Sequence, residues 1–301
     1  MNEVIAVEPE AFKDASEFLG FIGHFGFHQG RFVGVYPKKW VQQVIKNLDD
    51  KMTDHERTLV VEQLKKEKLE PYRTLAIEAD FKPAPVTWIE NAAQRKQEGI
   101  FSDVIVARGD STEFTSLPLL PDYFDKFPRD KEIFSDPDSY AEAARILLST
   151  AREIALFDPF LAKGRDTWKA VLDKFAKVAS AGICEEFKIF TLDDKSTPDE
   201  LNRWASRFYQ DVRKYVKVTH YVLRDKGNIE ADDHSRYLIS MKGALSFDKG
   251  FESDYPTARK RRVSIIDRKL HEKLYTQYLG DIEGYLPFEI VGAPLELDRI
   301  A

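Results

Sequence analysis

The chain has 301 residues, with 45 lysines and arginines against 51 aspartates and glutamates, and its formal net charge at pH 7 is -6. This acidic balance argues against nonspecific binding of polyanions by the whole surface and leaves local basic patches for that role. The length allows two domains of ordinary size, each with its own hydrophobic core.

The cysteine content and the hydropathy pattern indicate the cellular setting. Cys184 is the only cysteine, so no internal disulfide can form. We expect a small core residue in a protein of a reducing compartment. The first residues lack the basic segment and apolar core of a secretion signal, and no run reaches the roughly 18 apolar residues of a membrane span. We therefore expect a soluble, cytoplasmic protein.

Helical and strand-like patterns alternate in the first half of the chain and predict a small mixed α/β domain. The expected elements are a helix over 9–20, a strand over 31–36, a helix over 38–48, a helix after the capping box of Thr53 and Glu56, a helix over 87–99 opened by the capping box of Thr87 and Glu90, and a buried strand from Phe101. His24 and His28 lie four residues apart, but no HExxH pattern or cysteine pair accompanies them, so we expect a structural role.

Prolines punctuate residues 108–138, where no hydrophobic period is sustained, and this pattern indicates a connector. We place the domain boundary within it, with an N-terminal domain over 1–135 and a second domain over 136–301. The aromatic residues and leucines of 117–134 predict that the connector packs along a surface.

The second half shows a regular alternation of helix and strand patterns. The expected order is a helix over 139–153, a strand over 154–158, a helix over 167–181, a strand over 186–191, a helix from the Thr197 capping box, a strand over 216–223, a hairpin over 232–252, a strand over 263–267, a helix over 268–278 and a strand over 287–291. This order predicts an α/β (α+β) layered domain with a mixed sheet. Within it, His220 shares the valine side of its strand and is expected in the core.

The hairpin region, residues 232–252, holds the main candidate site. In a strand, residues two apart project from the same side, so His234 and Arg236 would present an imidazole and a guanidinium together, an arrangement suited to a phosphate. Tyr237 and Ile239 would face the opposite layer. Gly243 and Gly250 stand where the chain is expected to turn.

A basic run at residues 259–262 is the best polyanion candidate. Arg259, Lys260, Arg261 and Arg262 are adjacent, and neighbouring cations attract phosphates cumulatively. The alternative interpretation is a solvated loop in an acidic protein. The sequence has no GxxxxGK loop, no paired catalytic carboxylates and no metal-ligand cluster, so we expect neither a cofactor nor a metal.

Three motifs follow one another in the second half: Asp158-Pro159-Phe160 after a strand, His234-Ser235-Arg236 at the start of a later strand, and Gly250-Phe251-Glu252 at the end of the hairpin. In this order they resemble the phospholipase D-like domain, and most closely its divergent branch, the C-terminal domain of MIT-domain proteins and of bacterial relatives. The resemblance covers roughly residues 139–292. It implies a mixed-sheet layered domain that acts as a recognition module.

The chain departs from the catalytic phospholipase D pattern of His-x-Lys, four residues and Asp. Arg236 stands at the lysine position and Met241 at the aspartate position. His271 and Lys273 keep the His-x-Lys spacing, but they fall in a predicted helix where residues two apart cannot share a face. The family reaction needs a second histidine, which a symmetric dimer would supply.

His234 has three interpretations: a nucleophile, a phosphate or ligand contact, and a structural histidine held by Asp232 or Asp233. Asp158 is expected to accept hydrogen bonds from the backbone or from Arg236, and we place Asp158 and Asp233 among the ligand-binding candidates. Arg236 joins His234 as a catalytic candidate.

We therefore expect a module that binds a phosphate-bearing ligand, either nucleic acid or an acidic head group, or a protein partner, with catalysis lost or much altered. One alternative is a dimeric phosphodiesterase or nuclease that uses His234, in a bacterial antiviral system. Another is a scaffold whose aromatic segment over 117–134 docks a second protein.

Overall fold

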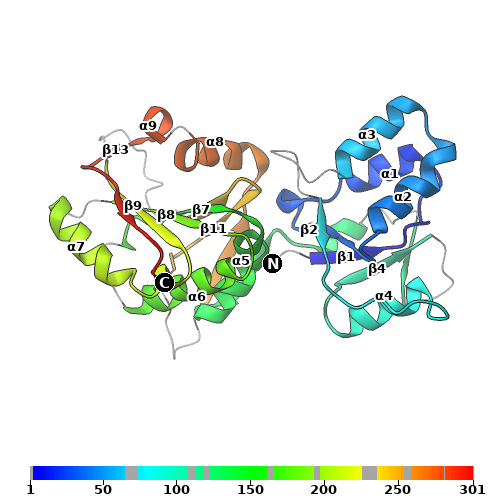
Figure 1. Cartoon of the computed structure of the whole chain (residues 1–301), viewed down its shortest axis with the longest axis horizontal. Coiled ribbons are helices and arrows are strands. Elements are labelled where there is room, and N and C mark those ends of the chain that lie inside the picture. The colour runs from blue at the N-terminus through cyan, green and yellow to red at the C-terminus, as the bar shows by residue number, and fades with distance from the viewer. Residues whose placement is uncertain are drawn as a thin grey trace. The chain divides into compact units, whose positions relative to one another are not determined.

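The chain divides into two compact units, Asn2–Arg129 and Asp130–Ala301. The structure, a computed structural model, describes residues 3–64, 73–107, 113–117, 119, 122–161, 166–192, 197–225, 236–251, 253, 259–280 and 282–300. Both units combine helices with a sheet (Figure 1), so the predicted mixed α/β class is confirmed.

The N-terminal unit contains a parallel sheet in the strand order β3-β2-β1-β4-β5. Its strands are β1 (Glu3–Val7), β2 (Arg31–Val35), β3 (Thr74–Ala76), β4 (Asp103–Val106) and β5 (Thr115–Ser116). Its helices are α1 (Ala15–Ile22), α2 (Trp40–Leu48), α3 (Asp54–Leu64) and α4 (Trp88–Gln97). Parallel strands need crossover connections, and the helices supply them.

Both faces of this sheet are covered. Ile5 packs with the helical residues Phe18 and Trp40 in one core cluster. On the other face, Val104 packs with Ala92 of α4 in a second cluster. Figure 1 shows α1, α2 and α3 on one side of the sheet and α4 on the other. Side chains alternate between the two faces along each strand, so a parallel sheet of this kind needs apolar residues at successive positions.

The C-terminal unit is built on a larger mixed sheet in the order β13-β9-β8-β7-β10-β11-β12-β6, with β14 also paired to β9. Its strands are β6 (Asp130–Phe134), β7 (Glu153–Phe157), β8 (Glu186–Leu192), β9 (Lys217–Asp225), β10 (Arg236–Ser240), β11 (Gly243–Phe247), β12 (Lys260–Ile265), β13 (Phe288–Ile290) and β14 (Leu295–Leu297). β7, β8 and β9 run parallel, whereas β10 is antiparallel to β7.

Helices cover both faces of this sheet as well. They are α5 (Pro137–Thr150), α6 (Asp166–Ser180), α7 (Pro198–Phe208), α8 (Arg268–Tyr278) and α9 (Ile282–Tyr285). Ile239 on β10 belongs to a core cluster with Leu274 and Tyr278 of α8, and Tyr237 packs against that cluster. Tyr237 and Ile239 therefore lie on the α8 face, as the strand alternation predicts. Figure 1 shows α5 and α6 on the opposite side of the sheet from α8.

β6 corrects the predicted connector. Residues 130–134 pair with β12 in antiparallel register, so this part of the presumed connector is a strand of the C-terminal sheet. The division at Arg129 accordingly lies before the boundary that we placed at residue 135.

No helix in the described residues is long and apolar enough to cross a membrane.

Candidate functional site

The candidate site lies where β7 ends and β10 begins. β10 runs antiparallel to β7, with Tyr237 opposite Phe157. The next pair in this register is Arg236 opposite Asp158. Because side chains alternate along a strand, both lie on the face of the sheet opposite α8. These two residues are 78 positions apart in the sequence, and the pairing of β10 with β7 brings them together.

Asp158 is fully buried at this point, with none of its surface exposed. Its Oδ1 accepts a hydrogen bond of 2.9 Å from the backbone N–H of Phe160. The same oxygen lies 3.8 Å from Nε of Arg236, so the two side chains form an ion pair. A buried carboxylate needs such partners because the loss of hydration is otherwise not compensated. The expected backbone hydrogen bond to Asp158 is thus present.

The guanidinium of Arg236 is held from several directions. In addition to Asp158, its Cζ lies 5.0 Å from the centre of the Phe160 ring, a cation–π contact. Its Nη1 donates a hydrogen bond of 3.4 Å to the carbonyl oxygen of Asp248. The side chain remains 12% exposed. A positively charged group is therefore fixed in direction, and part of it reaches the surface.

Gly250 packs directly against this ion pair. Its φ of +77° lies in the left-handed region, where a residue without a Cβ atom is favoured. A Cβ atom built at this position would lie 2.9 Å from Oδ2 of Asp158 and 3.0 Å from Nε of Arg236. The carbonyl oxygen of Gly250 also accepts a hydrogen bond of 3.1 Å from the hydroxyl of Tyr140. The glycine is thus required both by its backbone conformation and by the space that the pair occupies.

Tyr209 was not among the predicted site residues. It lies at the end of α7 and has no exposed surface. Burial, and to a smaller extent the negative charge of Asp158, raise the pKa of its hydroxyl well above the usual range. The hydroxyl of Tyr209 therefore stays neutral and lies close enough to Asp158 for the carboxylate charge to act on it. Nothing in the sequence around Tyr209 distinguishes it from an ordinary core tyrosine.

His234 and Asp233, the residues that would complete the predicted site, lie outside the described residues, as does Glu252 of the glycine motif. The structure thus gives the positions of Asp158, Arg236 and Gly250, whereas the side-by-side arrangement of His234 and Arg236 stays a prediction.

Most of the basic run at 259–262 lies in β12, which begins at Lys260, so it is not the solvated loop of the alternative interpretation. Lys260 and Arg262 project to one side of β12, where Lys260 Nζ lies 2.9 Å from Oε2 of Glu132 and Arg262 pairs with Asp130. Arg261 projects to the other side and is 7% exposed. Arg259 is exposed next to the strand. Because side chains alternate along a strand, the four cations do not form one cluster.

The other histidines considered from the sequence have structural surroundings. Nε2 of His271 lies 2.8 Å from the carbonyl oxygen of Ser240, and the side chain is buried. His220 is buried in the sheet, and burial lowers its pKa to about 4. The His24 ring stacks on Phe124 with centroids 4.4 Å apart. These contacts agree with the structural roles that we expected.

Cys184 is buried too, and burial raises the pKa of its thiol to about 12. A thiol with so high a pKa is not a nucleophile at neutral pH, since the thiolate is the reactive form. In the described part of the chain, no group of three or more His, Cys, Asp or Glu residues is placed to hold a metal ion.

The aromatic segment at 117–134 is largely used inside the molecule. Tyr123 and Phe127 are buried in the N-terminal core, and Phe124 packs against it. The hydroxyl of Tyr123 donates a 2.9 Å hydrogen bond to Oδ2 of Asp103. Most of the aromatic surface that suggested a docking segment is therefore internal, although Phe134 is 51% exposed.

Comparison with known proteins gives little guidance. No family model and no curated protein matches the chain. Among solved structures, the chain is similar to that described as "Structure of TrmBL2, an archaeal chromatin protein, shows a novel mode of DNA binding", with 17% sequence identity and a TM-score of 0.29. The match covers 52% of this chain and 53% of that one, so this chain spans about half the length of the archaeal protein. This likeness is too low to indicate a shared fold.

Proposed function

We propose that the C-terminal unit recognises a phosphate-bearing ligand at the edge of the sheet where β7 ends and β10 begins, and that Arg236 makes the principal contact. The observation that carries this proposal is the fixed and partly exposed guanidinium of Arg236 beside the buried Asp158. A planar guanidinium donates paired hydrogen bonds to phosphate oxygens and keeps its charge at any physiological pH. Asp158 acts as a positioning residue that holds the guanidinium.

Charge balance requires a second contact to the ligand. Asp158 already offsets the charge of Arg236, so the pair alone would attract an anion only weakly. His234 precedes Arg236 by two residues, and in an extended strand the two side chains would share a side. We propose His234 as the second contact, with its imidazole donating a hydrogen bond to the same phosphate.

The residues present favour recognition over catalysis. Arg236 occupies the lysine position of the phospholipase D pattern, and its guanidinium keeps the positive charge of that position. Met241, at the aspartate position, lies in the turn between β10 and β11 and is 41% exposed. The charge that would stabilise a transition state is therefore retained, while the carboxylate of the catalytic pattern is replaced by a methionine.

The test uses the full chain and several phosphate probes: inorganic phosphate, a single-stranded DNA oligonucleotide, an RNA oligonucleotide, and phosphatidylcholine vesicles with and without phosphatidylserine. We expect one probe to bind, with an affinity that falls as salt is added. The Arg236→Met variant should bind about tenfold more weakly because a charged hydrogen bond is lost, whereas Arg236→Lys should lose less because it keeps the charge.

The matched control is Arg203→Met, which removes an exposed arginine on α7. It should leave binding unchanged, and circular dichroism should show that every variant is folded. Equal binding by the Arg236 variants and the unmodified chain, or no binding of any probe, would contradict the proposal. Hydrolysis of bis(4-nitrophenyl) phosphate that disappears in His234→Ala would instead support the dimeric phosphodiesterase.

A further inference from the structure

β6 forms one end of the C-terminal sheet. The strand order runs from β13 to β6, and β6 pairs only with β12 within the described part of the chain. The outer edge of such a strand presents backbone N–H and C=O groups that another extended chain can bind. The pairing register shows which of these groups face outward.

The N–H of Ser135 donates a 2.8 Å hydrogen bond to the carbonyl oxygen of Arg259, which stands directly opposite it. In an antiparallel ladder, hydrogen-bonded and non-hydrogen-bonded pairs alternate. Lys131 and Ile133 therefore direct their backbone groups toward β12, and Asp130, Glu132 and Phe134 direct theirs to the outer edge.

An independent bond agrees with this assignment. The N–H of Asp248 donates a hydrogen bond to the carbonyl oxygen of Arg262, so the backbone groups of Arg262 point toward β11. Glu132, the residue opposite Arg262 on β6, therefore makes no backbone hydrogen bond to Arg262.

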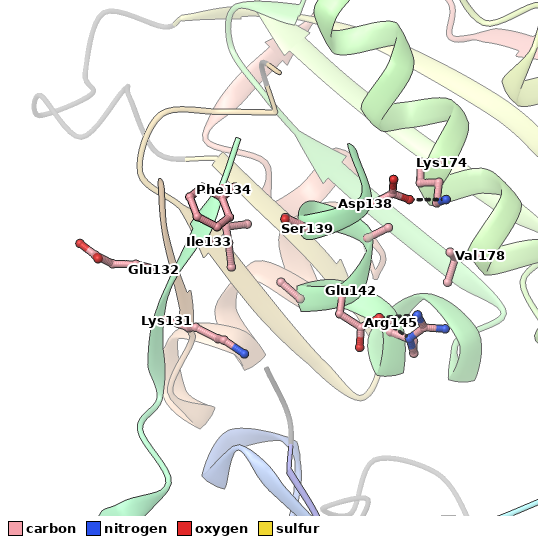
Figure 2. Close-up of a pocket in the computed structure, with 12 residues that line it drawn as sticks. Lys131, Glu132, Ile133, Phe134, Asp138, Ser139, Glu142, Arg145, Lys174 and Val178 are labelled. Carbon is pink, nitrogen blue, oxygen red and sulfur yellow. Dashed lines mark hydrogen bonds and ion pairs between the residues drawn. The ribbon is translucent and has the colours of Figure 1, made fainter. Parts of the chain in front are cut away.

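A groove runs alongside this edge, between β6 and α5, with a volume of about 560 Å³. Ile133, Phe134, Ala141 and Val178 provide its apolar lining. Figure 2 shows Glu132 pointing away from the groove, and Glu142 and Arg145 lying together on α5 at the opposite wall. An added strand would place every second side chain on the groove side.

We propose that the outer edge of β6 binds an extended peptide segment of a partner protein by strand addition. The backbone of the peptide pairs with the outward groups of Glu132 and Phe134, and its alternate side chains enter the groove. This surface is a second binding site, apart from the phosphate site at Arg236.

The charges along the groove determine the chemistry of the peptide. Glu142 is paired with Arg145, and Lys174 with Asp138. Lys131 also lines the groove; its charge acts on Glu142 from a distance, but no carboxylate of the described residues forms an ion pair with it. The peptide therefore carries a carboxylate on its groove side next to Lys131, and an apolar residue two positions away next to Ile133.

Charged residues on an edge strand also serve to prevent aggregation, and Asp130, Lys131 and Glu132 fit that role. Two features of this edge are not explained by protection against aggregation. Phe134 is 51% exposed on the same strand, and the edge borders a largely apolar groove of about 560 Å³. An edge that only repels other chains needs neither feature.

The experiment selects binders from a displayed library of random peptides against the full chain. Expected sequences have an apolar and an acidic residue two apart. Glu132→Pro removes an outward N–H without touching the ladder to β12 and should weaken the selected peptides about tenfold, since edge positions tolerate proline. Glu132→Gln is the matched control: it removes the charge, keeps the N–H and should bind as the unmodified chain does.

Amide hydrogen exchange supplies a second readout. Glu132 and Phe134 should exchange rapidly in the free chain and slow down at least tenfold when peptide binds. The proposal fails if the library yields no binder, if the peptides bind equally to the proline variant, or if these amides stay unprotected. Sedimentation that shows self-association lost in Glu132→Pro would assign the edge to a second copy of the chain and overturn it as well.

Discussion

Nε of Arg236 lies 3.8 Å from Oδ1 of Asp158, so a cation at the start of β10 and a carboxylate at the end of β7 form an ion pair in which the carboxylate is completely buried. Removing one member leaves the other charge without its partner in a poorly solvated place. We predict that Asp158→Asn lowers the free energy of unfolding by about 3 kcal/mol, measured by urea denaturation.

The double variant tests whether the two residues act together. Arg236→Met in the Asp158→Asn background should cost less than Arg236→Met alone, with a coupling free energy of about 1–3 kcal/mol. Additive effects of the two changes would show that the pair contributes no interaction of its own.

Gly250 gives a second prediction, because it combines a left-handed backbone with a close approach to the same ion pair. Gly250→Ala should destabilise the C-terminal unit by about 2 kcal/mol, of which about 1 kcal/mol is the backbone term. The added methyl group would displace Arg236 or Asp158, since both lie within 3.0 Å of its position. Phosphate binding should weaken as well.

The matched control is Gly20→Ala in α1. No atom lies within 4 Å of a Cβ built there, and the residue is inside a helix. Alanine should be neutral or stabilise the N-terminal unit by up to about 1 kcal/mol. If both substitutions had the same effect on thermal unfolding, the special role of Gly250 would be refuted.

Local signals in the sequence predicted local structure well. The capping boxes of Thr87 with Glu90 and of Thr197 with Glu200 both form, because their reciprocal hydrogen bonds involve only residues three apart. β6 was missed because Asp-Lys-Glu-Ile-Phe carries almost no strand pattern of its own and becomes a strand only through β12, far along the chain.

The basic run shows the same limit. Four adjacent cations suggested a single basic patch. In the structure the run pairs with β6 as a strand, so its side chains alternate between two faces, and Lys260 and Arg262 form ion pairs with Glu132 and Asp130. A contact of Asp158 with Arg236 was one of the two expectations for Asp158, and the register between β10 and β7 brings it about. Tyr209 was not, since its position near Asp158 depends on the packing of α7, which no motif records.

His220 predicts how stability changes with acid. Its folded pKa of about 4 lies below its usual 6.5, and burial is the cause. A group whose pKa is lower in the folded than in the unfolded chain contributes its full stability above the pKa of the unfolded chain. That contribution is lost as the pH falls toward the pKa of the folded chain. Between pH 6.5 and 4 the C-terminal unit should therefore lose about 3 kcal/mol of stability from this residue.

His220→Leu removes the titrating group and nearly keeps the volume. Neither ring nitrogen of His220 has a hydrogen-bond partner in the described part of the chain, so the variant should be at least as stable as the parent at pH 7. Urea denaturation at several pH values should show a flatter profile between pH 6.5 and 4. An unchanged profile would mean that His220 is not the group that responds.

Asp173 on α6 should act in the opposite direction. Burial, and then the negative charge of Asp211, raise its pKa to about 6, against smaller effects of Lys169 and Lys214. A carboxyl group with a raised folded pKa stabilises the fold below its unfolded value of 3.8, and that contribution is lost as the pH rises through 6. At pH 7 the ionised Asp173 is therefore unfavourable.

Asp173→Asn should then stabilise the C-terminal unit at pH 7 by on the order of 1 kcal/mol, a value reduced from the full shift because the side chain is only half-buried. The gain should vanish below pH 4, where the carboxyl group of Asp173 becomes neutral in the folded and in the unfolded chain. Asp211→Asn supplies the comparison: it should lower the pKa of Asp173, followed by carbon-detected NMR of its carboxyl group. A gain from Asp173→Asn that is equal at pH 7 and pH 4 would show that packing, and not charge, sets the cost of this residue.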